Sequence, residues 1–574
     1  MAAPVVQVAP QDGIDAPIPL LAPEIQAEAS GPALSRGDVW FVTPLPKVQV
    51  FLLAFASLSD PVIVTFVYPF INERIGDISN SPEQLARWSG LIFGCYALAQ
   101  FLFVYVWGAL SDRVGRRPII MACLTICTVS TVVFGVVEKY WQMLLSRTIS
   151  GISYGDVPVI RSAMGDVTDS TNQARAFSFI PLCWTIGSTI APLIGGFLSH
   201  PERRFPDRFK NSQYFLDHPY ALPCFVAAIV PAISFIFITL FFRETLPSHP
   251  LTNTLKHEEE SRLLSPQALS MAGVNYGSTG VTRLSIRPLS QSEEQRAAAS
   301  TTPPSQPEDH TSVRQILKDP IVRGVVLSYG LLAMISTSND YIFALWMYIA
   351  VDHGGISLTP AQIATALSIG SIMGTLMLAF VFPPLHKKVG TLKIYRVAMV
   401  FDFIFILLYP AVHAIAAATV ETRHHEHTGS FRHFPDPAHD AGFGGESGES
   451  WHDVPFWLKF GVAVMLIVKA IASLTWGSNA ILVTAAAPSA HCLGKVNSLA
   501  LMTASAARTI GPPMYASIFA LSMNRHVLGG TWLIWIFMGA MALASLAVSF
   551  VVQEGNRPWR HLNPGDRTPL HRSE

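Results

Sequence analysis

The chain has 574 residues, and half of them are hydrophobic while only 14% are charged. Soluble domains carry roughly 25% charged residues, so this composition argues against a soluble enzyme, and we predict neither enzymatic activity nor a cofactor or resident metal. Acidic and basic residues balance to a net charge of zero. The chain therefore lacks the excess of positive charge that would indicate nucleic acid as a partner.

Apolar runs of about 20 residues alternate with short charged clusters along the chain. A run of that length crosses a hydrocarbon core of roughly 30 Å, and inside lipid its backbone must satisfy its own hydrogen bonds as a helix. We therefore predict an all-α membrane protein with twelve transmembrane helices. The predicted spans are 48–71, 88–110, 118–137, 141–163, 176–198, 221–242, 322–350, 361–383, 394–418, 456–484, 496–522 and 530–552.

Hydrophilic stretches organise these spans into two bundles of six helices. The first stretch, 1–47, shows no apolar core of a signal peptide, and the central stretch is rich in Ser, Pro, Gln and Glu, which is typical of disorder. The predicted order is a cytosolic N-terminus at 1–47, a bundle at 48–242, a disordered cytosolic loop at 243–320, a bundle at 321–552 with a His-rich outer loop at 420–455, and a cytosolic tail at 553–574.

An internal repeat supports this division. Gly108–Arg117 follows the second span and Pro383–Leu392 follows the eighth, 275 residues later, with Leu, a basic residue, Val and Gly retained. Ile190–Pro192 in the fifth span is likewise echoed by Ile510–Pro512 in the eleventh. Two pseudo-symmetric halves with a substrate site between them are a known transporter design.

Orientation follows from the basic residues. Those near 113–117, 387–396 and 557–572 lie on one side of the predicted topology, and an excess of Lys and Arg marks the cytosolic side. The segment 199–220 does not fit, because its four basic residues fall on the outer side. We assign the side that carries the repeat and the tail to the cytosol.

Charged residues inside the spans are candidates for the mechanism, because a charge in the bilayer is costly. Asp60 lies near the middle of the first span and Asp340 lies deep in the seventh. Each is a candidate to bind a proton or substrate. The alternative for each is a carboxyl that pairs with a basic residue or caps a broken helix.

The fourth span carries Arg147 and Asp156, nine residues apart. Nine steps of 100° place them on opposite faces of a helix, so we do not expect them to pair. Arg147 is a candidate to face an acid such as Asp60, with a structural ion pair between helices as the alternative. Three other intramembrane charges favour a structural role, with Lys469 paired to Asp402 and Arg508 near the Gly511-Pro512 break.

The fifth span is rich in small residues and contains a proline. Small residues let helices approach closely, and proline bends a helix. We predict a hinge and seal between the two halves here, with simple close packing as the alternative. The residues concerned are Gly187, Ala191, Pro192, Gly195 and Gly196.

The loop after the second span is the most specific motif of the chain. Its glycine permits a tight turn, its aspartate can accept hydrogen bonds from a helix N-terminus, and its arginines can reach Asp166 or lipid headgroups. We predict a gate on the cytosolic side, against the alternative of a basic topogenic loop. The residues are Gly108, Asp112, Arg113, Gly115, Arg116 and Arg117.

These motifs resemble the major facilitator superfamily. Gly108–Arg117 is similar to that family's loop 2–3 signature, and the run from Gly187 to Gly196 resembles the antiporter signature of its twelve-span drug exporters, with Ala191 where Gly is usual. Leu144–Gly151 resembles their span-four element, whose Arg is implicated in proton transfer. Arg243–Pro247 resembles endings in fungal members. The resemblance covers about 48–552 without the long loops, and it implies the major facilitator fold.

The resemblance implies proton-coupled efflux of small organic compounds, either drugs or secondary metabolites. The expected partners are a small-molecule substrate, protons and the lipid bilayer, and we expect a monomer in the plasma membrane or, as the alternative, the vacuolar membrane. Other hypotheses are transport of a metal or nutrient, given the histidines around 424–452, and a non-transporting sensor. Candidates to line the site are Phe66, Tyr68, Tyr96, Tyr154, Trp184, Tyr341, Trp346 and Trp476.

Overall fold

The computed structural model of the protein contains only helices in the part of the chain that it describes. The described residues are 43–79, 81–168, 172–209, 211–245, 313–426, 451, 454–488, 492–523 and 532–553. The all-α prediction is confirmed for them. Most of 1–47, 243–320, 420–455 and 553–574 lies outside them, including the side chains of the His-rich loop. The chain divides into two units, Met1–Pro44 and Leu45–Glu574, and every described helix belongs to the second unit.

The first half follows the predicted spans, but the first and fourth spans are interrupted near a proline, and the fifth is interrupted at Ser178. It contains α1 (Lys47–Ser57), α2 (Ser59–Thr65), α3 (Ile71–Gly76), α4 (Pro82–Val114), α5 (Arg116–Val136), α6 (Tyr140–Ser153), α7 (Asp156–Val167), α8 (Gln173–Phe177), α9 (Phe179–Leu198), α10 (Pro201–Arg204), α11 (Pro206–Phe209), α12 (Gln213–Asp217) and α13 (Ala221–Phe241). Pro61 lies three residues after the break at Leu58, and Pro158 lies three residues after the break at Gly155. Each proline lacks the N–H that would bond to the carbonyl four positions earlier.

The second half repeats this plan with a different irregularity. It contains α17 (Val313–Ile316), α18 (Pro320–Tyr348), η1 (Val351–His353), α19 (Pro360–Leu376), η2 (Met377–Val381), α20 (Phe382–Val389), α21 (Thr391–Glu426), α22 (Phe456–Ala472), α23 (Leu474–Ala486), α24 (Leu493–Met523) and α25 (Leu533–Val551). The stretch η2 is a π-helix. Pro383 and Pro384 lie two and three residues after its end, and their missing N–H groups favour such a wider turn.

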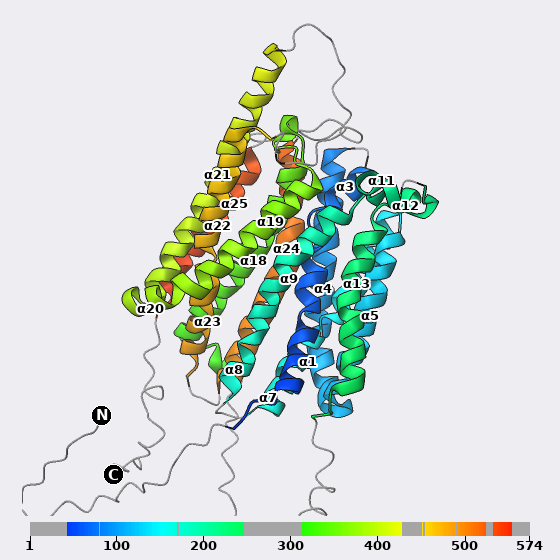
Figure 1. Cartoon of the computed structure of the whole chain (residues 1–574). Coiled ribbons are helices and arrows are strands. Elements are labelled where there is room, and N and C mark those ends of the chain that lie inside the picture. The colour runs from blue at the N-terminus through cyan, green and yellow to red at the C-terminus, as the bar shows by residue number, and fades with distance from the viewer. Residues whose placement is uncertain are drawn as a thin grey trace, which may run out of the picture. The chain divides into compact units, whose positions relative to one another are not determined.

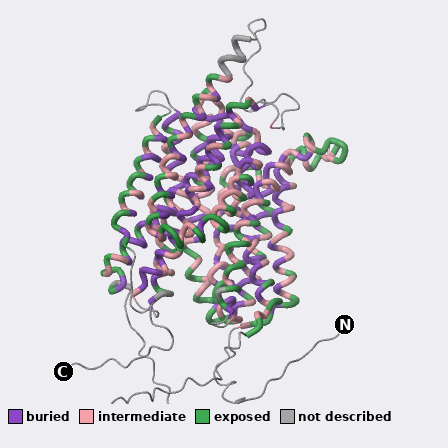
Figure 2. Tube along the Cα trace, turned by 60° about the vertical axis from the view of Figure 1, so that its left-hand side comes forward, coloured by how far each residue is buried: buried purple, intermediate pink, exposed green. Residues whose placement is uncertain are grey.

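Ten helices of the described chain are long and apolar enough to cross a membrane. The predicted fourth and eleventh spans are not among them. The fourth is divided between α6 and α7, and the eleventh is α24, a helix of 31 residues. Large apolar side chains such as Leu240, Ile536 and Phe380 are 65%, 64% and 72% exposed on the outside of the helices. Figure 2 shows these exposed stretches alternating with buried ones, as expected where lipid replaces water.

The main helix pairs that join the halves are α4 with α24 and α9 with α19 (Figure 1), and α18 adds contacts to the first half. The hydroxyl of Ser368 donates to the carbonyl of Thr189 at 2.7 Å, and the hydroxyl of Tyr341 donates to the carbonyl of Ala86 at 3.1 Å. We call the end of the bundle that carries the α4–α5 and α20–α21 corners the basic end. These joining contacts lie in the middle of the helices and toward the opposite end.

Candidate functional site

Two buried carboxyl groups of the first half lie beside each other. Asp60 belongs to α2 and Asp156 is the first residue of α7, and they are 7% and 3% exposed. Each stands just after the helix break that a nearby proline produces, so the breaks bring both side chains into the interior. The two carboxyls lie within hydrogen-bonding reach of each other.

This carboxyl pair has no basic side chain in ion-pair contact among the described residues. The Oδ1 atom of Asp156 also lacks a hydrogen-bond partner there. Two carboxylates this close repel each other, so ionising both is costly, and an uncompensated buried charge is strongly destabilising. The geometry is therefore that of two acids that share a proton.

Arg147 lies near this pair but makes other contacts. Its side chain is buried, and its Nη1 atom donates to the carbonyl of Ile63 at 3.1 Å. The guanidinium lies 4.6 Å from the ring centroid of Phe134 and 5.5 Å from that of Phe66. It forms no ion pair with Asp156 in the described chain. Arg147 thus joins α6 to α2 through the backbone, three residues after Asp60.

In the second half, Asp340 of α18 forms an ion pair with Lys469 of α22. The Nζ and Oδ1 atoms are 2.8 Å apart, and both side chains are partly exposed. The ammonium also lies 4.9 Å from the ring centroid of Phe343. The sequence-based pairing of Lys469 with Asp402 is wrong, because its ion pair among the described residues is with Asp340, and Asp402 lies only within its electrostatic range.

Arg508 of α24 has a different environment from Lys469. Its guanidinium lies 5.8 Å from the ring centroid of Trp476, in α23, and it forms no ion pair among the described residues. Tyr68 and Tyr154 of the first half both lie within electrostatic range of Arg508. Tyr154 is also within range of the Asp60–Asp156 pair. The charged groups of the two halves therefore approach one another around these tyrosines.

The predicted hinge residues of α9 lie where helices approach most closely. A Cβ atom on Gly195 would lie 1.8 Å from the carbonyl oxygen of Phe66, and one on Gly196 would lie 2.4 Å from that of Pro360 in the second half. A Cβ on Gly187 would lie 2.6 Å from Cγ of Pro61. Small residues are thus required on two faces of α9. Ala191 and Pro192 are buried between these glycines.

The α4–α5 corner is held by a carboxylate that the sequence analysis did not assign to it. Glu244 follows α13, and its Oε1 and Oε2 atoms accept hydrogen bonds from the backbone N–H groups of Arg116 and Arg117 at 2.8 and 3.0 Å. These are the first N–H groups of α5, so the negative charge also complements the helix dipole. Gly115 makes the turn with φ +117°, and a Cβ there would lie 2.6 Å from Glu244. In the sequence, the motif Arg243–Pro247, which contains Glu244, was the feature that could have indicated this contact.

The other side chains of this corner form an ion-pair network. Arg116 contacts Asp112 and, with its Nε atom 3.2 Å from Oδ2, Asp166. Arg113 is exposed, and Gly108 would accept a Cβ with no atom within 4 Å. Of the six predicted gate residues, Asp112, Gly115, Arg116 and Arg117 therefore make the specific contacts, and the side chain of Arg117 donates to the carbonyl of Thr239.

A polar cluster at the end opposite the basic end was missed by the sequence analysis. His200 lies 2.9 Å from Glu202, 3.2 Å from the hydroxyl of Tyr220 and 3.6 Å from Glu73, and that hydroxyl donates to Asp77 at 2.5 Å. Burial raises the pKa of Glu73 to about 7. Burial lowers the pKa of His200, but the hydrogen bond with Glu202 outweighs this and leaves it raised. The only sequence signal was the acid directly after the first apolar run.

Known proteins place this architecture in a family. The family model described as Major Facilitator Superfamily matches residues 50–422. The chain is 27% identical over 516 residues to "Major facilitator-type transporter psiT2" of Psilocybe cyanescens, covering 88% of this chain and 89% of that one. It is 25% identical over 496 residues to "Efflux pump azaK" of Aspergillus niger, covering 86% of each.

A solved structure shows the same fold. A bacterial homologue of the human lysosomal transporter Spinster, in an inward-facing and unoccupied conformation, aligns with a TM-score of 0.53 and 15% identity, covering 89% of this chain and 95% of that one. The helices of this chain, paired as two halves, and the family match over most of its spans agree with that alignment. The chain therefore belongs to the Major Facilitator Superfamily of membrane transporters.

Proposed function

We propose that this chain is a proton-coupled exporter of small organic compounds, in which the Asp60–Asp156 pair binds the proton. The observation that carries the proposal is the burial of two adjacent carboxyls that form no ion pair among the described residues, with Arg161 only within electrostatic range of Asp60. Ionisable groups inside membrane spans mark proton relays. The similarity to a protein named as an efflux pump supports the direction of transport.

The helix contacts suggest how a proton on this pair drives a conformational change. Loss of the shared proton leaves two like charges side by side, which repel and push α2 away from α7. Because Pro61 of α2 contacts Gly187 of α9, and Gly196 of α9 contacts α19, the movement passes to the second half. Rocking of one half against the other is the motion that alternating access needs.

The other predicted roles follow from this scheme. The close-packed face of α9 acts as the hinge and seal, and the α4–α5 corner acts as the gate of the basic end, which faces the cytosol. Arg147 acts through the backbone of α2 rather than by contact with the proton. The transporter works as a monomer in the plasma membrane, surrounded by lipid.

Transport by proteoliposomes tests the proton role directly. Asp60→Asn and Asp156→Asn each remove one carboxyl while keeping its size. We expect each to abolish accumulation driven by a pH gradient and to keep substrate exchange without a gradient within about twofold. Since the two carboxyls share one proton, the double variant is expected to be no worse than either single one.

Asp207→Asn, on the exposed helix α11, is the matched control and is expected to behave as the parent protein. Gradient-driven accumulation that persists in both single variants would contradict the proposal. Strictly additive losses in the double variant would contradict a shared proton.

A further inference from the structure

Arg508 is a cation at membrane depth that the proton mechanism does not use. Its side chain is half-buried in α24, and its contact in the described structure is with the ring of Trp476 at 5.8 Å. The other cation of the second-half spans described above, Lys469, is already paired with Asp340 at 2.8 Å. A charge in this position is costly and requires a counter-ion. The described residues supply none for Arg508.

The aromatic partner of Arg508 is held in place by its own contacts. The indole Nε1 atom of Trp476 donates to the hydroxyl of Ser336 at 3.3 Å, and the ring of Tyr329 meets it edge-on with centroids 6.1 Å apart. Ser336 and Tyr329 lie seven residues apart on α18, which places both on one face of that helix. The ring of Trp476 is therefore fixed beside a guanidinium that has no ion-pair partner in the described chain.

The position of Arg508 is also the one expected for substrate contact. It lies one turn before Pro512 in α24, the helix that packs against α4 of the first half. Tyr68 and Tyr154 of the first half are within its electrostatic range. The guanidinium thus lies between the halves, at the depth of the charged groups of both.

We propose that Arg508 and Trp476 bind the anionic group and the aromatic ring of the exported compound, so that the substrate class is aromatic organic anions. A guanidinium binds a carboxylate or phosphate through two parallel hydrogen bonds and still stacks on a ring. A fixed indole provides the stacking surface for an aromatic body. This inference rests on the proposed export function but concerns a different half of the molecule.

Three compounds that share one aromatic ring system but differ in charge test this assignment. The probes are 2-naphthoate, its neutral amide and the cationic 2-naphthylmethylamine, with binding measured by calorimetry on the full chain in phosphatidylcholine nanodiscs. We expect the carboxylate to bind at least about tenfold more tightly than the amide, since hydrogen bonds to charged groups are worth this much. Tighter binding of the amine than of the carboxylate would overturn the proposal.

Substitutions separate the charge from the ring. Arg508→Gln is expected to bring the carboxylate and the amide within twofold of each other, while Arg508→Lys keeps part of the preference. Trp476→Leu is expected to weaken all three probes. Arg396→Gln is the matched control, because Arg396 also stacks on a ring, that of Phe550 at 4.8 Å, but at the basic end. A preference that survives Arg508→Gln would refute the assignment.

A lipid phosphate is the other source of an anion at this depth. Nanodiscs with one-third phosphatidylserine distinguish it, and we expect the affinity for 2-naphthoate to change less than twofold. Loss of the preference for the carboxylate in those nanodiscs would show that Arg508 binds lipid, and the proposal would be wrong.

Transport under an imposed membrane potential distinguishes this inference from the proton role. Exchange of one entering proton for one leaving anion moves two charges in the same direction, whereas exchange for a cation moves none. Export of 2-naphthoate is therefore expected to rise severalfold with an inside-negative potential, and export insensitive to potential would contradict the anion class. Transport by Asp60→Asn could remain dependent on a proton gradient while Arg508→Gln still loses its preference for the carboxylate. In that case the proton proposal fails and the anion assignment stands.

Discussion

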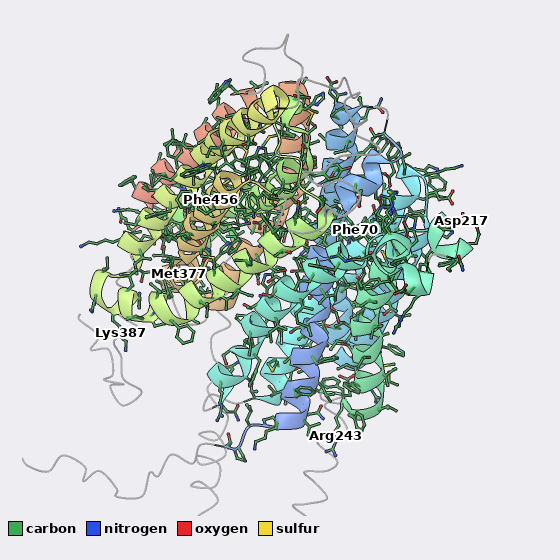
Figure 3. All side chains as sticks on the ribbon, turned by 45° about the horizontal axis from the view of Figure 1, so that its top comes forward. Phe70, Asp217, Arg243, Met377, Lys387 and Phe456 are labelled. Carbon is green, nitrogen blue, oxygen red and sulfur yellow. The ribbon has the colours of Figure 1, made fainter. Side chains whose placement is uncertain are left out.

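The chain makes the same tight turn twice but supports the two turns differently. Gly115 joins α4 to α5 with φ 117° and ψ 156°, and Gly390 joins α20 to α21 with φ 86° and ψ 157°. The first glycine is enclosed by Glu244, whereas a Cβ on the second would have no atom within 4 Å. Figure 3 marks the two corners by Arg243, beside the first, and Lys387, beside the second.

This comparison distinguishes the residue that both turns require from the contacts that are seen at the first turn. Both corners need a residue that tolerates positive φ, and glycine stands at both. Among the described residues, only the first corner shows bound carboxylates. In the repeat, Lys387 stands where Asp112 does, and Thr391 stands where Arg116 does and contacts His386 at 3.2 Å. In the described part of the second half, Thr391 has no equivalent of the Arg116–Asp166 ion pair.

The largest expected difference between the corners comes from replacing each glycine. Gly115→Ala forces an unfavourable φ and displaces Glu244 from two N–H groups, so we expect a loss of about 3 kcal/mol in the free energy of unfolding. Gly390→Ala meets only the backbone cost of about 1–2 kcal/mol. Thermal unfolding of both variants in detergent measures this. Equal losses would mean that the carboxylate does not enclose the first corner tightly.

The stability of the opposite end of the first half also depends on carboxylates, so it should change with pH. Because the pKa of Glu73 is raised from about 4.5 to about 7, its contribution to stability is full below pH 4.5 and is lost as pH rises through 7. The raised pKa of His200 acts in the same direction above pH 6.5, while the lowered pKa of Glu202 matters only as pH falls below 4.5. Stability should therefore fall between pH 5 and pH 8.

Glu73→Gln is expected to flatten this fall, by at most about 3 kcal/mol, which is the value of a shift of this size. Melting temperatures at pH 5 and pH 8 for the parent and the variant measure the difference. Asp207→Asn on the exposed helix α11 provides the control. An unchanged pH dependence in Glu73→Gln would exclude Glu73 as its source.

The smallest effect is expected from removing charge at the first corner while keeping its shape. Glu244→Gln still accepts one hydrogen bond but loses its charge beside the N-terminus of α5, and we expect a cost of about 1–2 kcal/mol. Lys388→Gln, which is exposed at the second corner, should cost less than about 0.5 kcal/mol. Chemical denaturation of the two variants compares them. A larger effect at Lys388 would reverse the contrast between the corners.

Local features of this protein could be read from the chain. The apolar runs predicted most helices, and the loop glycine predicted a turn that recurs in the second half. The prolines at 61 and 158 were visible, but the helix breaks that they produce were not predicted. A proline removes one hydrogen bond wherever it occurs, and only the packing around it decides whether the helix bends or breaks.

The charged groups show the limit of prediction from local features. Asp60 and Asp156 were both named as candidates, but 96 residues separate them and nothing local indicated that they meet. Lys469 was paired with the wrong acid for the same reason. Glu244 and Arg116 lie 128 residues apart and their contact was also missed.

The sequence by itself determined that the chain is a helical membrane protein with two related halves, because bilayer thickness and backbone hydrogen bonding act on each span separately. Only the tertiary structure decided which charges pair and which remain without a partner. The rotation and spacing of each helix depend on contacts such as that of Gly195 with Phe66, and these come from residues far apart in the chain. A side chain is directed toward its partner only once that packing has formed.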